Sequence, residues 1–112
     1  MIDTHCHLTE ERLLNNIDEV LLDAKEAGVE RIIVPATSLE DAQKVIELTK
    51  KYEDVYGLVG IHPEEIAHCT FDIEHLRGLI VENKKVLGIG EIGMDFYWDK
   101  ERKFEREQIE LF

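Results

Sequence analysis

Residues 31–50, RIIVPATSLEDAQKVIELTK, show most clearly the pattern on which the fold of this chain is based. Its first five residues, Arg31–Pro35, form a short apolar run typical of a buried strand. Ser38 then begins SLED, a near capping box, and the apolar residues after it recur at three- and four-residue spacing. The stretch therefore predicts a buried strand followed at once by an amphipathic helix.

Similar units lie on both sides of this stretch. Further strand-like runs cover Met1–Thr4, Val55–Ile61 and Val86–Glu91. Each is followed by a helical pattern, over residues 13–24, 73–80 and 104–112. Gly28 stands where the glycine after a helix belongs, and Asp99 is expected to cap the last helix. Alternating strands and helices predict a parallel sheet with right-handed crossovers.

Four such units are half of the eight that close a TIM barrel. We therefore expect an α/β fold in which residues 1–112 form a single (β/α)4 domain, the N-terminal half of a (β/α)8 barrel. The last helical pattern runs to Leu111 and Phe112 without a glycine or a cationic turn, which is typical of an interrupted helix. The expectation is a chain truncated relative to a complete barrel.

Composition restricts the class of protein. The chain is 44% hydrophobic and 34% charged, as in soluble globular proteins. No apolar run reaches the roughly 20 residues of a membrane span, and no cationic leader is present. These features predict a cytoplasmic protein with no membrane partner, in which Cys6 and Cys69 are free thiols. The net charge of −12 argues against a nucleic-acid scaffold, but only weakly against an enzyme whose metals meet the phosphate.

His5-Cys6-His7 follows the first strand. Residues two apart in an extended chain project from the same face, so both imidazoles point one way and Cys6 faces the helices. Two converging imidazoles at this end of a barrel strand suit a divalent metal, and the alternative is a pair of structural or surface histidines. Glu91 ends the fourth strand, and alternation places it with Leu87 and Ile89 on the inner face. A carboxylate there favours a shared metal over a salt-bridged glutamate at the rim.

Two further polar residues follow strands at the same edge. His62 precedes Pro63, which biases it to an extended conformation aimed at this rim, where it could orient a phosphate or support a metal ligand. By itself His62 is more readily explained as structural. Asp95 is a comparable carboxylate that could hydrogen-bond a ligand histidine.

Two other motifs resemble functional sites, but the sequence favours another interpretation of each. Residues 88–93, GIGEIG, match a dinucleotide fingerprint by letter, but no helix follows at once and Glu91 would repel a pyrophosphate. Phe96, Tyr97 and Trp98 could stack against bases, although packing against the following helix is the favoured interpretation.

The motifs DTHCHL (3–8), GIHP (60–63) and GEIGMD (90–95) occur in order at strand ends. With them the chain resembles the TatD family of metal-dependent deoxyribonucleases. Related phosphoesterases also begin with Asp-x-His-x-His, but the last two motifs favour TatD. The resemblance implies that His5 and His7 bind a first metal and that Glu91, the catalytic carboxylate, bridges two. It also places His62 and Asp95 near the site.

The implied activity is two-metal hydrolysis of phosphodiester bonds in DNA, with Mg²⁺, Mn²⁺ or Zn²⁺ as cofactor. The resemblance puts the remaining family ligands, after strands five, six and eight, beyond residue 112. We therefore expect this chain by itself to be inactive or impaired, and to associate with a second copy or a completing half-barrel. The alternative is a non-catalytic module that binds metal or self-assembles as a half-barrel.

Overall fold

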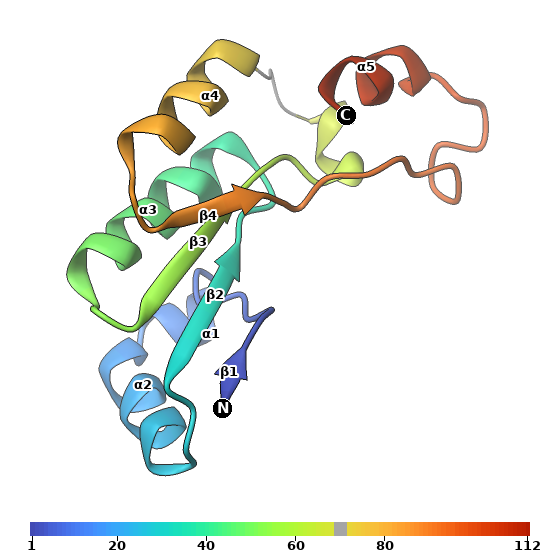
Figure 1. Cartoon of the computed structure of the whole chain (residues 1–112). Helices are drawn as coiled ribbons and strands as arrows, with labels where there is room; N and C mark the ends of the chain where they lie inside the picture. Colours follow the sequence, from blue (N-terminus) through green and yellow to red (C-terminus); the bar gives the residue numbers. More distant parts are fainter. Residues whose placement is uncertain (69–71) are drawn as a thin grey trace.

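The computed structural model describes residues 1–68 and 72–112 and shows parallel strands with helices against one face of the sheet (Figure 1). The strands are β1 (Ile2–Asp3), β2 (Arg31–Pro35), β3 (Val55–Val59) and β4 (Val86–Ile89). The helices are α1 (Glu11–Leu14), α2 (Ile17–Glu26), α3 (Leu39–Lys51), α4 (Ile73–Glu82) and α5 (Glu105–Leu111), with the 3₁₀ helix η1 (Pro63–Ala67). Cys69 lies outside the described residues. None of the described helices is long and apolar enough to cross a membrane.

The four strands pair in chain order, β1-β2-β3-β4, and every pairing is parallel. This confirms the expected α/β class with a parallel sheet. Arg31–Pro35 forms a strand as predicted, whereas β3 and β4 each end two residues earlier than expected. The chain leaves β3 to enter η1, an element that the sequence pattern had not indicated.

Two helix boundaries lie where the sequence signals predicted them, and two do not. Ser38 caps α3, its side chain accepting a hydrogen bond from the N–H of Asp41 at 3.1 Å. Gly28 has a φ of 86°, the left-handed conformation expected after α2. The first helical pattern divides into α1 and α2 around residues 15–16. The prediction that Asp99 caps the last helix is wrong, because α5 begins only at Glu105.

The carboxylate of Asp99 instead closes a turn. It accepts hydrogen bonds from the N–H groups of Lys103 and Phe104, at 2.8 and 2.9 Å. Arg102 within this turn has a φ of 53°, a left-handed conformation that a helix cannot contain. The turn therefore delays the start of α5.

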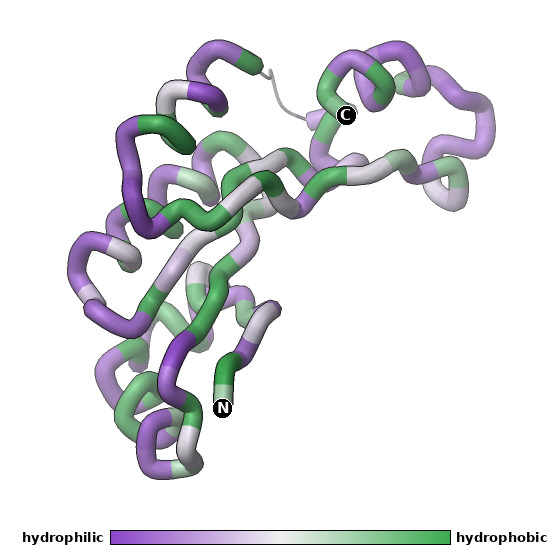
Figure 2. Tube along the Cα trace, in the orientation of Figure 1, coloured by the Kyte–Doolittle hydropathy of each residue, from purple (hydrophilic) through white to green (hydrophobic). Residues whose placement is uncertain are grey.

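The core lies between the sheet and the helices. Strand β3 alternates buried and half-buried residues, and its glycine, Gly57, faces Val45 and Thr49 of α3. In β2, Ile32, Val34 and Pro35 are buried. The buried cluster contains residues of both layers, among them Ile32, Val34, Ala42, Val45, Val55 and Val59. The strands lie along hydrophobic segments of the chain (Figure 2). The opposite face of the sheet carries half-buried residues such as Tyr56 and Leu58, with no helix over it in Figure 1.

The side chains of β4 do not alternate between the two faces of the sheet as predicted. Gly57 pairs with Val86 but Leu58 pairs with Gly88, so Leu87 is an extra residue in β4. Such a bulge reverses the facing of every residue after it. Gly88 and Gly90 therefore face Leu58, and Ile89 lies in a groove that α4 also lines. The prediction that Ile89 shares the inner face with Glu91 is wrong.

Candidate metal centre

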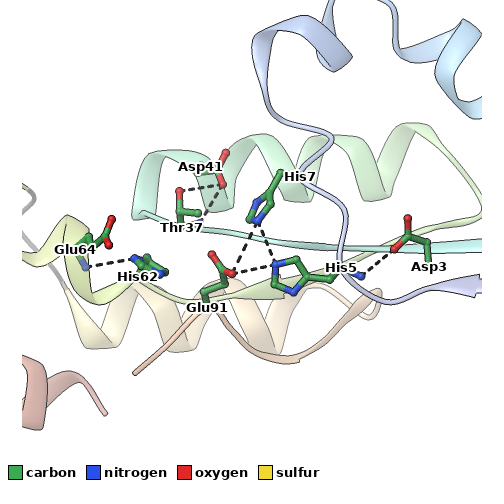
Figure 3. A network of polar contacts seen from close by, with 8 residues as sticks. All are labelled: Asp3, His5, His7, Thr37, Asp41, His62, Glu64 and Glu91. Atoms are coloured by element: carbon green, nitrogen blue, oxygen red, sulfur yellow. Dashed lines mark hydrogen bonds and ion pairs between the residues drawn. The ribbon is translucent and has the colours of Figure 1, made fainter. Parts of the chain in front are cut away.

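His5, His7 and Glu91 meet at the carboxyl edge of the sheet (Figure 3). The Nε2 atoms of the two histidines are 3.2 Å apart. Oε1 of Glu91 is 3.0 Å from Nε2 of His5 and 3.9 Å from Nε2 of His7. One potential ligand atom from each residue lies within 4.8 Å of the other two. The structure thus brings together the three residues that the sequence pointed to as metal ligands.

The two histidines are positioned by the chain that continues past β1. The N–H of Cys6 donates to the carbonyl oxygen of Ile33 at 3.2 Å, which extends the pairing with β2. Cys6 is half-buried and packs against the core, as alternation predicted. Burial raises the pKa of its thiol, and the carboxylates of Asp3 and Glu10 raise it further. Because Cys6 packs against the core between the sheet and the helices, both imidazoles point the other way, to the edge where Glu91 lies.

Glu91 is positioned by the ends of two other strands. Its N–H donates to the carbonyl oxygen of Ala36, just after β2, at 2.8 Å. The N–H of Gly90 donates to the carbonyl oxygen of Val59, the last residue of β3, at 3.1 Å. The Glu91 side chain is only 23% exposed. The ends of all four strands therefore help to build one small cluster, β1 and β4 through its side chains and β2 and β3 through the backbone bonds that hold Glu91.

The donor atoms fit a divalent cation. Ligand atoms about 2.1 Å from one ion, at angles of 90–109°, lie roughly 3.0–3.4 Å from one another. The separations of 3.0, 3.2 and 3.9 Å between the atoms of His5, His7 and Glu91 lie close to this range. Two imidazole nitrogens and a carboxylate oxygen form a ligand set suited to Zn²⁺ or Mn²⁺ and acceptable to Mg²⁺.

His62 lies in the same hollow as this cluster. Its Nδ1 accepts a hydrogen bond from the N–H of Glu64 at 3.3 Å and so caps η1. The hollow, of about 390 Å³, is lined by His7, Thr9, Glu10, Thr37, Asp41, His62, Glu64, Glu65 and Glu91. His62 therefore has a structural role through Nδ1 and a place beside the ligand group.

Asp95 is not brought to the cluster. Its carboxylate accepts hydrogen bonds from the N–H groups of Tyr97 and Trp98, at 2.9 and 3.1 Å, rather than from a histidine. Its backbone is bonded at both polar atoms to the side-chain amide of Gln108, which is buried. A short carboxylate side chain at the start of a turn readily bonds the N–H groups two and three residues on. This local bonding overrides the predicted contact with a ligand histidine.

Thr37 and Asp41 line the hollow and were missed in the sequence. Oδ2 of Asp41 accepts a hydrogen bond from the N–H of Thr37 at 3.0 Å, and Oγ1 of Thr37 lies 3.5 Å away (Figure 3). Thr37 follows β2, so the rule that found the other residues at strand ends would also have found it. Carboxylates dominate the hollow, with Glu10, Asp41, Glu64, Glu65 and Glu91 among its lining residues. Such a hollow attracts cations and repels an unaccompanied phosphate.

The chain resembles proteins of one family along its whole length. A family model described as TatD related DNase matches residues 2–112. The metal-dependent hydrolase YjjV of Escherichia coli is 37% identical over 109 residues, which are 96% of this chain and 42% of that protein. The 3'-5' ssDNA/RNA exonuclease TatD of Dickeya dadantii is 29% identical over 96% of this chain and 41% of its own length.

Solved structures agree with the sequence relatives. The crystal structure of E. coli YjjV superposes with a TM-score of 0.87 and 35% identity, covering 99% of this chain and 43% of that one. A TatD-family hydrolase from Entamoeba histolytica gives a TM-score of 0.78 with 28% identity over 99% of this chain and 42% of that one. The chain spans less than half the length of these relatives and matches their N-terminal portion. It belongs to the TatD-related DNase family, and its four parallel strands correspond to part of that family's TIM barrel.

Proposed function

We propose that this chain supplies His5, His7 and Glu91 to the divalent-metal centre of a hydrolase that cleaves phosphodiester bonds in DNA. The observation that carries the proposal is the convergence of two imidazole nitrogens and one carboxylate oxygen within 4.8 Å. A bound Mg²⁺, Mn²⁺ or Zn²⁺ would supply Lewis acidity toward a phosphate oxygen and toward water. The relatives support this class of reaction by their names, which include a metal-dependent hydrolase and an ssDNA/RNA exonuclease.

Each residue has a separate task in this proposal. His5 and His7 offer imidazole nitrogens as ligands. The packing of Cys6 against the core fixes the direction in which both side chains point. Glu91 is mostly shielded from solvent and offsets the cation's charge. His62 lies in the same hollow, where it can donate to a substrate phosphate while Nδ1 remains bonded to η1. Asp95 contributes by holding the loop after β4 in place.

The acidic hollow makes metal binding a precondition for binding the substrate. Five carboxylates line it, and the whole chain has a net charge of −12. Without a cation, these charges would repel the phosphate of a DNA strand. The proposal therefore requires that DNA cleavage depends strictly on divalent metal.

Isothermal titration calorimetry with Mn²⁺ or Zn²⁺ tests the metal centre. We expect saturable binding by the chain and a loss of at least about tenfold in affinity for His5→Ala and for Glu91→Gln, because each removes a ligand. His75→Ala is the matched control, since His75 is an exposed histidine on α4. Equal affinity in Glu91→Gln and in His75→Ala would contradict the proposal.

A second candidate is a metal-binding half-barrel without catalysis of its own. Within the described residues the structure holds a single ligand cluster of this kind, with three members, and the chain spans 42% of YjjV. Cleavage of single-stranded DNA with Mn²⁺, compared with full-length E. coli YjjV at equal concentration, separates the two candidates. We expect far slower cleavage by this chain alone. Fast cleavage that is lost with EDTA and in Glu91→Gln would show that the chain, or an assembly of it, is a complete catalyst.

A further inference from the structure

Two large aromatic side chains in the segment between β4 and α5 are exposed. Tyr97 is 68% exposed and Trp98 is 69% exposed. Their rings lie edge to face, with centroids 4.7 Å apart and planes at 86°. The expected packing of this aromatic run against the following helix is therefore wrong for these two residues. An exposed Tyr-Trp pair buries little apolar surface, so it contributes little to folding stability and calls for a different explanation.

The loop that carries the pair is held in one conformation. We call residues 95–104 the aromatic loop. The carboxylates of Asp95 and Asp99 accept hydrogen bonds from four backbone N–H groups of this loop. The buried side-chain amide of Gln108 forms two more hydrogen bonds, with the N–H and the carbonyl oxygen of Asp95. Rings presented by an ordered loop lose little conformational entropy when a ligand stacks on them. The exposure of Tyr97 and Trp98 is thus built into the structure of the loop.

The aromatic loop differs in charge from the chain as a whole. It contains three basic and three acidic residues, a net charge of zero in a chain whose total is −12. Nζ of Lys100 lies 5.6 Å from the centroid of the Tyr97 ring, and the Arg102 guanidinium lies 4.5 Å from that of Phe96. Arg102 and Lys103 form ion pairs with Glu105 and Glu101, each at 2.9 Å, whereas Lys100 lies beside the Tyr97 ring as the cation placed to face a ligand. An anionic ligand with aromatic groups complements this surface.

The loop borders the proposed site of hydrolysis. Trp98, Lys100, Lys103 and Phe104 line a hollow of about 560 Å³, together with the carboxylates of Glu64, Asp95, Asp99 and Glu101. Glu64 lines this hollow and also the hollow that contains His7 and Glu91. The two hollows therefore adjoin at Glu64 of η1, which gives a chain-like ligand a path from Trp98 towards His7 and Glu91.

We propose that Tyr97 and Trp98 form a stacking platform for a base of single-stranded nucleic acid, with Lys100 placed to contact the adjoining phosphate. Exposed bases stack on aromatic side chains whatever their sequence, and lysines beside the rings follow the backbone. The inference rests on the proposed function, because the platform would hold the strand whose scissile phosphate lies at His5, His7 and Glu91. Duplex DNA, with its bases already stacked, has no free base to offer the platform.

The chain carries its own probe for this proposal. Trp98 is the single tryptophan, so tryptophan fluorescence reports on the platform alone. The titrant is a short oligothymidylate with nuclease-resistant phosphorothioate linkages, in Mg²⁺ at low ionic strength. An abasic oligomer with the same linkages is the matched control. We expect saturable quenching by the oligothymidylate and little by the abasic oligomer. Equal quenching by both, or none by either, would overturn base stacking.

Substitutions in and outside the aromatic loop test where the oligothymidylate binds. With a labelled oligothymidylate and fluorescence anisotropy, we expect Tyr97→Ala and Trp98→Ala to weaken binding at least about fivefold. Phe112→Ala, which removes an aromatic ring that is 75% exposed outside the loop, should leave binding unchanged. Lys100→Ala should weaken binding and reduce its salt dependence, whereas Lys44→Ala on α3 should do neither. Circular dichroism verifies that each variant is folded.

The results separate this inference from the proposed function. Base-dependent quenching in a chain that binds no metal would support the platform and refute the hydrolase centre. Metal binding lost in Glu91→Gln, with oligothymidylate affinity unchanged in Tyr97→Ala and Trp98→Ala, would refute the platform and leave the centre intact. Quenching by a protein partner but not by oligothymidylate would also refute it.

Discussion

The α-carbon of Gly60 lies directly against the backbone that carries Glu91. A Cβ placed on Gly60 would lie 2.7 Å from the carbonyl carbon of Gly90 and would overlap the carbonyl oxygen of Glu91. Backbone cannot give way as a flexible side chain can. The close approach of these two segments, one after β3 and one after β4, therefore helps to set where Glu91 stands relative to His5 and His7.

We expect Gly60→Ala to destabilise the chain by about 1–3 kcal/mol, because the methyl group must displace backbone. The shift should also weaken metal binding by moving Glu91. Gly78→Ala is the control: an added Cβ there meets nothing within 4 Å, and alanine in α4 should stabilise by about 0.5–1 kcal/mol. Urea unfolding and metal titration measure both effects. A neutral Gly60→Ala would mean that the two segments separate freely.

Lys85 anchors the start of β4 to the end of α3. Its ammonium donates to the carbonyl oxygens of Thr49 and Tyr52, at 2.8 and 2.6 Å, and lies 5.2 Å from the centroid of the Tyr56 ring. Partial burial lowers the pKa of Lys85, although nearby carboxylates oppose this shift. Its charged hydrogen bonds compensate carbonyl groups at the carboxyl end of a helix.

We therefore expect Lys85→Met to lower the free energy of unfolding by about 1–2 kcal/mol, after allowance for solvent screening. Lys84→Met, at the exposed neighbouring position, should change it by less than about 0.5 kcal/mol. The two variants are compared by urea unfolding in the same buffer. Equal midpoints would show that the contacts of Lys85 contribute no net stability.

Gln108 joins α5 to the aromatic loop through a buried amide that is 1% exposed. Its Oε1 accepts from the N–H of Asp95 at 2.7 Å, and its Nε2 donates to the carbonyl oxygen of Asp95 at 3.1 Å. Gln108→Leu keeps the size but leaves both backbone groups without a partner, at a cost of about 1–3 kcal/mol. Hydrogen exchange should then rise at residues 95–104 and stay unchanged in β2. Unchanged exchange in the loop would contradict this role.

We also expect the chain to associate. Strands β1 and β4 are the two edges of the sheet, and parallel sheets seldom leave a face bare. The groove beside β4 is apolar, and Ile89 within it is 62% exposed. Sedimentation should give a mass above the monomer, and Ile89→Lys should lower it. Leu22→Lys, at an apolar position on α2 that is 56% exposed, should not. A monomer at every concentration would refute the expectation.

The order of strands and helices, and the residues of the metal cluster, could be predicted from local sequence patterns. Ser38 caps α3 and Gly28 ends α2 as predicted, because both depend on atoms a few residues away. His5 and His7 were identified because side chains two apart share a face in extended chain, whatever lies around them. Motifs at strand ends were enough to recognise the family.

Features that depend on partners far along the chain could not be predicted in this way. The extra residue Leu87 reverses the facing of Ile89 only because Leu58 pairs with Gly88, a register that no local pattern shows. Thr37 joins the metal hollow because β2 ends beside Glu91. Gln108, ten or more residues after Tyr97 and Trp98, ties the Asp95 end of their loop to α5, and both rings remain exposed. Pairing and packing between distant segments select one arrangement among several that each local sequence permits.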